Sequence, residues 1–225
     1  MSRLPSAPAK TQRRTAETFE RVQFESRKAL RAWLAKNHGR AKSIWCVTWK
    51  KRPGAPYIPY ADIVEEALCF GWIDSLPRAL DDARTMLLLS PRKRKSNWSK
   101  SNKERAERMI AAGKMTSAGM AVIELAKADG RWSFLDDVEA LAAPGDLQAA
   151  LKGVANAKEN WERFPASTRR GILEWIKNAM SAETRKRRIE TTADLAGKNI
   201  RANQYRQIVP SQTQSRPIKA RKSAN

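Results

Sequence analysis

The stretch YADIVEEALCFGWIDS, residues 60–75, decides the fold because it joins a helical pattern directly to a strand pattern. Ile63, Ala67 and Leu68 recur on one helical face, and Gly71 follows as a residue that readily ends a helix. Beyond the glycine, the side-chain spacing becomes that of a strand. A helix that passes through a glycine turn into a strand indicates a unit in which helices pack with a sheet.

Two further stretches supply the other predicted strands. SIWCVTWKK, residues 43–51, is rich in β-branched and aromatic residues and predicts a strand buried on both faces. WIDSLPRALDDARTMLLLSPR, residues 72–92, predicts a strand, a turn and a second strand. We therefore expect a small antiparallel sheet.

Helical patterns with well-defined first residues surround these strands. SRKALRAWLAKNHG, residues 26–39, begins at Ser26, and SKSNKERAERMIAAGK, residues 99–114, begins at Ser99. Serine is favoured at the N-cap because its hydroxyl accepts a hydrogen bond from a free backbone N–H of the first turn. Thr116 is placed in the same way before a further helical pattern.

Composition and pattern divide the chain into four parts. Residues 17–130 indicate an α+β domain and residues 131–197 an all-helical domain, so the predicted fold class is α+β. Residues 1–16 carry four cations and no acid, and residues 198–225 carry seven cations and no acid. Both end segments also contain prolines, and we predict a disordered basic arm and a disordered basic tail.

The formal net charge of +21 bears on the partners of the protein and not on its fold. A charge of this size attracts nucleic acid and other polyanions, and it also favours peripheral contact with an anionic membrane. The alternative is a generally cationic surface with no specific partner. The excess lies partly in the two end segments, which suit contact with a flexible phosphate backbone.

Composition also argues against several classes of site. Cys46 and Cys69 stand among apolar neighbours, where cysteine usually acts as a small buried hydrophobe. A single histidine and no CxxC pair give no metal-ligand spacing, and we expect no metal and no cofactor. The first residues lack the apolar run of a signal peptide, and no stretch approaches the length of a membrane span. We therefore expect a soluble, cytoplasmic protein.

The first candidate site is a ligand pocket that joins the second predicted strand to the third predicted helical region. In it Asp74 would form a bidentate pair with Arg92, and two tryptophans would supply stacking surface. The alternative is a structural role, in which the pair is a buried ion pair that fastens the strands to the helix. The pocket candidates are Trp72, Asp74, Arg92, Trp98 and Asn102.

The second candidate is the cationic stretch SPRKRKSNWSKSN, residues 90–102. It predicts either the capped start of a helix or a surface that binds anions, and Trp98 would stack on an unpaired base only if it were exposed. A cationic run is also commonly a solvated face. The polyanion-binding candidates are Arg92, Lys93, Arg94, Lys95, Lys100, Lys103 and Arg105.

Several motifs in the same order resemble the YdeI/OmpD-associated family, also called the bacteriocin-protection family, over about residues 19–197. The motifs are WLAKNH (33–38), ALCFGWIDS (67–75), SPRKRKSNWSKSN (90–102), MTSAG (115–119), AKADGRW (126–132) and ILEWIKNAMSAETRKRRI (172–189). The resemblance implies a bacterial protein linked to bacteriocin protection or envelope stress. It brings no catalytic residues, because the family is not defined by a reaction.

The sequence therefore predicts a non-enzymatic protein that binds a polyanionic partner. An enzymatic function would need paired acids or an activated nucleophile. Neither stands out in the sequence pattern, so we assign no catalytic residue. One alternative is non-specific binding of DNA or RNA as the main role. The other is an enzyme or binder for a small anionic ligand in the Trp/Asp/Arg pocket. The oligomeric state is left open.

Overall fold

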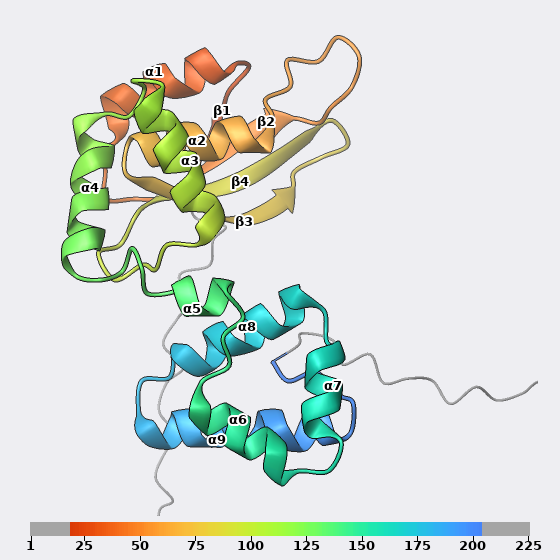
Figure 1. Ribbon diagram of the computed structural model, residues 1–225. Helices are drawn as coiled ribbons and strands as arrows, with labels where there is room; N and C mark the ends of the chain where they lie inside the picture. The colour runs from red at the N-terminus through yellow and green to blue at the C-terminus, as the bar shows by residue number, and fades with distance from the viewer. Residues whose placement is uncertain (1–18, 204–225) are drawn as a thin grey trace, which may run out of the picture. The chain divides into compact units, whose positions relative to one another are not determined.

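The computed structural model describes residues 19–203, which form two compact units (Figure 1). The first unit ends at Asp136 and the second begins at Asp137. The predicted arm, residues 1–16, and the predicted tail from residue 204 onward lie outside the described residues.

The first unit is built on a mixed sheet of four strands, which confirms the α+β class. The order is β1-β2-β4-β3, with β1 parallel to β2 and the other two pairs antiparallel. The predicted antiparallel sheet therefore accounts for three strands, and the short edge strand β1 is an addition. The strands are β1 (Glu20–Gln23), β2 (Ile44–Trp49), β3 (Trp72–Ala79) and β4 (Arg84–Pro91).

The helices of the first unit begin where the cap residues predict. The hydroxyls of Ser26, Ser99 and Thr116 accept hydrogen bonds from the backbone N–H groups three residues ahead. The helices are α1 (Arg27–Asn37), α2 (Tyr60–Cys69), α3 (Lys100–Ala111), α4 (Ser117–Ala128) and α5 (Asp136–Glu139), which stands at the division between the units.

The main core of this unit lies between the sheet and the first helices. Leu30 and Leu34 of α1 pack with Ala67 of α2 against Cys46 and Leu89 of the sheet, and all five side chains are buried. Helices of this kind are stabilised mainly by burial of their apolar face, which contributes about 25 cal/mol for each Å² removed from water.

A buried carboxylate fixes α1 on α2. Glu66 is 2% exposed, and its two oxygens accept hydrogen bonds from Arg27 at 2.6 Å and Arg31 at 2.7 Å. Arg31 also donates to the carbonyl oxygen of Lys114, ahead of α4. Burial opposes the charge of both arginines, but their hydrogen bonds and attraction to Glu66 raise their pKa values. The two arginines of α1 thus join α2 and the segment ahead of α4, which are far apart in the sequence.

The turn between α2 and β3 requires glycine. Gly71 has a φ of +74°, and a side chain there would meet Val122 at 2.9 Å. Its carbonyl oxygen accepts a hydrogen bond from the backbone N–H of Arg92 at 2.9 Å, at the end of β4. The turn therefore brings the end of β4 beside α4.

The start of α4 rests directly on the end of α2. The hydroxyl of Thr116 donates to the carbonyl oxygen of Cys69 at 2.5 Å. Gly119 lies so close to the same carbonyl that an added Cβ would stand 2.4 Å from the oxygen. This backbone approach sets the spacing between the two helices.

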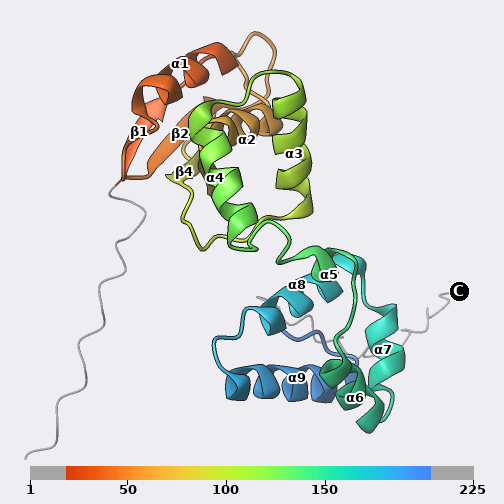
Figure 2. The same ribbon diagram turned by 60° about the vertical axis from the view of Figure 1, so that its left-hand side comes forward.

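The described part of the second unit contains helices and no strand, as the predicted fold class expects. Helix α9 packs beside α6 and α7 (Figure 2), and the buried core includes Leu147, Trp161, Ile172, Ile176 and Ile189. The helices are α6 (Gly145–Gly153), α7 (Ala157–Arg163), α8 (Ala166–Lys177) and α9 (Ala182–Gly197). Over residues 19–203, no helix is long and apolar enough to cross a membrane.

We predict that Gly119→Ala destabilises the first unit by about 1–3 kcal/mol, because the new methyl group meets the backbone of α2. The matched control is Gly39→Ala in the same unit, where nothing lies within 4 Å of the added Cβ. The control should change the free energy of unfolding by less than about 0.5 kcal/mol. Urea unfolding followed by circular dichroism measures both changes, and equal effects would contradict the close helix packing.

Candidate functional site

Trp72 belongs to the core and not to a cavity. It is 1% exposed, and its indole N–H donates to the carbonyl oxygen of His38 at 2.9 Å. Its ring meets that of Trp33 edge to face, with the ring centroids 6.0 Å apart. This predicted pocket residue is therefore fully used by the packing of α1 on the sheet.

Asp74 pairs with a tyrosine and not with the predicted arginine. The hydroxyl of Tyr60, at the start of α2, donates to Oδ2 of Asp74 at 2.6 Å. Partial burial and this hydrogen bond raise the pKa of Tyr60 to about 12. Within residues 19–203, no ion pair or hydrogen bond joins Asp74 to Arg92. The predicted bidentate pair is thus corrected, because each side chain has another partner.

The guanidinium of Arg92 lies over the ring of Trp98. Its guanidinium carbon is 3.8 Å from the centroid of the Trp98 ring, and Nη2 donates to the carbonyl oxygen of Asn97 at 2.6 Å. Trp98 is only 2% exposed and packs against Trp132, with the centroids 4.9 Å apart. Since Trp98 is buried, it offers no surface on which an unpaired base could stack.

Three donor atoms at this stack are buried and lack an acceptor. They are Nε and Nη1 of Arg92 and Nε1 of Trp98, and none has a hydrogen-bond partner in the part of the chain that the structure describes. Burial lowers the pKa of Arg92 to about 10, although Asp74 attracts its charge. The guanidinium is therefore still charged at neutral pH. Leaving such donors without an acceptor is costly.

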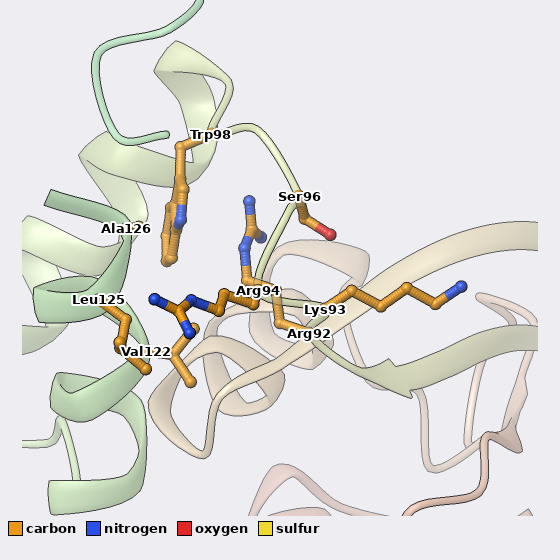
Figure 3. Close-up of a pocket in the computed structure, with 8 residues that line it drawn as sticks. All are labelled: Arg92, Lys93, Arg94, Ser96, Trp98, Val122, Leu125 and Ala126. Atoms are coloured by element: carbon orange, nitrogen blue, oxygen red, sulfur yellow. The ribbon is translucent and has the colours of Figure 1, made fainter. Parts of the chain in front are cut away.

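A cavity of about 90 Å³ opens beside the stack, between the segment that follows β4 and helix α4. The guanidinium of Arg92 lies between the Trp98 ring and the side chains of Val122 and Leu125, while Lys93 points away from them (Figure 3). The lining residues are Arg92, Lys93, Arg94, Ser96, Trp98, Val122, Leu125 and Ala126.

Sequence reasoning found Arg92 and Trp98 but missed the α4 side of the cavity. Val122, Leu125 and Ala126 stand at ordinary positions of an amphipathic helix, and no local spacing connects them with the cationic stretch. The predicted pocket residues Trp72, Asp74 and Asn102 do not line this cavity.

The predicted cationic face divides into an exposed loop and an internally bonded helix. Lys93, Arg94 and Lys95 are exposed between β4 and α3, and Arg94 has an ion pair to Asp129 at 3.9 Å. Among residues 19–203, neither Lys93 nor Lys95 has an acidic partner.

On α3, Lys100 is also exposed, but two other predicted cations are half-buried. Lys103 forms an ion pair with Asp136, and Arg105 donates to Oδ1 of Asn102 at 3.0 Å. The stretch is therefore both the capped start of a helix and, ahead of the cap at Ser99, a cationic loop.

The two cysteines are poor nucleophiles in this fold. Both are buried, and burial raises the pKa of Cys46 to about 12 and that of Cys69 to about 11. In the described part of the chain, no group of histidine, cysteine and acidic residues is arranged to hold a metal ion. Neither cysteine is therefore an activated nucleophile.

We predict that Asp74→Asn lowers the free energy of unfolding by less than about 1 kcal/mol, because it weakens one partly exposed hydrogen bond to Tyr60. The comparison variant is Glu66→Gln, which removes a buried charge between two arginines and should cost roughly 3 kcal/mol. Urea unfolding measures both. If Asp74→Asn lowered the free energy of unfolding as much as Glu66→Gln, the result would support the predicted ion pair between Asp74 and Arg92.

Comparison with known proteins divides the chain in the same way as its structure. Residues 140–199 match the family described as Bacteriocin-protection, YdeI or OmpD-Associated, and this range contains α6 to α9. Residues 22–122 match a family described as Domain of unknown function (DUF8412). The resemblance to the YdeI/OmpD-associated family is thus confirmed in the helical unit, while the Arg92–Trp98 site lies in the other match. No curated protein and no solved structure matches the chain.

Proposed function

We propose that this chain, whose helical unit matches the YdeI/OmpD-associated family, is a non-enzymatic protein that binds a polyanion. The observation that carries the proposal is the loop between β4 and α3. It presents Lys93, Arg94 and Lys95 to solvent, and two of these three cations have no acidic partner among the described residues. Cations that have no acidic partner attract phosphate groups without first breaking an internal ion pair.

The net charge supports the same class of partner. At +21 the chain attracts nucleic acid from a distance, and its affinity should fall steeply as salt is added. The buried ring of Trp98 argues against recognition of unpaired bases by stacking at this loop. Contact through charge alone is independent of base sequence. We therefore propose non-specific binding of DNA or RNA as the form that polyanion binding takes.

The biological setting of this activity is also part of the proposal. The description of the matched family links it to bacteriocin protection. We propose that binding of a polyanion serves such a protective or stress-related role in the cytoplasm. An anionic membrane surface is the competing partner, and it would be recognised by binding to anionic vesicles that short DNA does not displace.

The test is fluorescence anisotropy with labelled single- and double-stranded DNA and RNA over a salt series. We predict that the double variant Lys93→Gln/Lys95→Gln binds more weakly than the unaltered protein. The slope of log affinity against log salt should become shallower by roughly one for each lysine removed. The loss arises because the variant neutralises fewer phosphates.

The matched control is Lys152→Gln/Lys198→Gln, which removes the same charge from two exposed lysines of the other unit. It should keep nearly the affinity of the unaltered protein. Equal losses in both variants would mean that only the net charge matters and would refute the loop as the contact surface. No binding at low salt by the unaltered protein would overturn the proposed function itself.

A further inference from the structure

The three buried donors at the Arg92–Trp98 stack lack the acceptor that such atoms normally have. Buried polar atoms in folded proteins almost always have a partner, and an exception calls for a physical explanation. Here Nε and Nη1 of one guanidinium and the indole N–H beneath it are all without one in the described chain. The same arrangement adjoins a cavity. An anion in this cavity would supply the acceptor that these donors lack.

No side chain among the described residues supplies this acceptor. Val122, Leu125 and Ala126 form an apolar wall, and Oδ2 of Asp74 accepts the Tyr60 hydroxyl. An apolar wall lowers the local dielectric and strengthens the attraction between the guanidinium and any anion that enters. The site is therefore poor in protein acceptors and favourable to a ligand that brings its own.

The other polar side chains at the cavity can also donate hydrogen bonds. Arg94 lines it with a second guanidinium, and Ser96 lines it with a hydroxyl (Figure 3). The volume of about 90 Å³ compares with about 15 Å³ that a single water requires, so a small tetrahedral oxyanion fits the space. Guanidinium groups match the oxygens of such an anion because their N–H groups form a planar fork.

We propose that this cavity binds one phosphate group, held by the guanidinium of Arg92 together with Arg94 and Ser96. The inference rests on the proposed function, because it identifies the group that the same loop would take from a polyanion. Nε and Nη1 of Arg92 are covered by neighbouring atoms, so the proposed binding requires the guanidinium to turn toward the cavity. This turn alters the stack on Trp98, which places a spectroscopic reporter at the site.

The chemistry that is recognised is an oxyanion of the phosphate class, and it has two sources. One is free inorganic phosphate, and the other is the terminal phosphate of a nucleic acid strand. The experiment therefore uses inorganic phosphate and a pair of short oligothymidylates, one with a 5′-phosphate and one with a 5′-hydroxyl. A signal from the phosphorylated strand alone identifies the terminal phosphate as a ligand.

The readout is the indole N–H resonance of Trp98 in a ¹⁵N correlation spectrum of the full chain. Its assignment comes from the single resonance that disappears in Trp98→Phe. We expect a saturable shift of this resonance with potassium phosphate and none with potassium chloride at the same ionic strength. Arg92→Lys should weaken phosphate binding roughly tenfold, since lysine cannot form the paired hydrogen bonds.

The matched control is Arg108→Lys on α3, an exposed arginine that pairs with Glu65. It should bind phosphate as the unaltered protein does. Absence of a saturable shift in the unaltered protein, or the same shift with chloride, would overturn the phosphate site whatever the variants do. Intact oligonucleotide binding together with that negative result would leave the proposed function standing. Phosphate binding without oligonucleotide binding would support the phosphate site and overturn the proposed function.

Discussion

The first unit depends on the buried carboxylate of Glu66 and the two arginines that hold it. Arg27 and Arg31 both come from α1, and Arg31 reaches on to the backbone ahead of α4. A carboxylate that is 2% exposed is stable only when it is paired and hydrogen-bonded, so these bonds favour the observed packing of α1 on α2. The position of α2 then determines where its C-terminal turn leads, and the rest of the unit follows from that turn.

The candidate site is a direct result of this arrangement. Gly71 turns the chain from α2 into β3, and its carbonyl oxygen accepts a hydrogen bond from the backbone N–H of Arg92. Gly119 lets α4 approach the end of α2. Arg92 and α4 therefore face each other across the cavity. Backbone contacts thus position the walls of the cavity, and the exposed cations lie on the adjoining loop between β4 and α3. In the proposed function, the loop attracts an anion by charge and the cavity holds one of its groups.

The two units carry different features that bear on function. The match to the YdeI/OmpD-associated family covers the helical unit, whereas the cationic loop and the unpaired donors belong to the α+β unit. The proposed protective role therefore rests on the helical unit, and the proposed binding of an anion rests on the other unit. Neither family match extends over both units, so the role of each unit has to be assigned separately.

Local patterns in the sequence determined the elements of the fold. Ser26, Ser99 and Thr116 cap their helices as predicted, because a cap needs only residues a few positions apart. The edge strand β1 escaped prediction because its four residues are mostly exposed and gain their structure from β2. The site was decided only by tertiary structure. Arg92 lies on Trp98, and Asp74 is hydrogen-bonded to Tyr60. Such choices between partners depend on distances that the packing of α2 and α4 sets, and no spacing along the chain contains them.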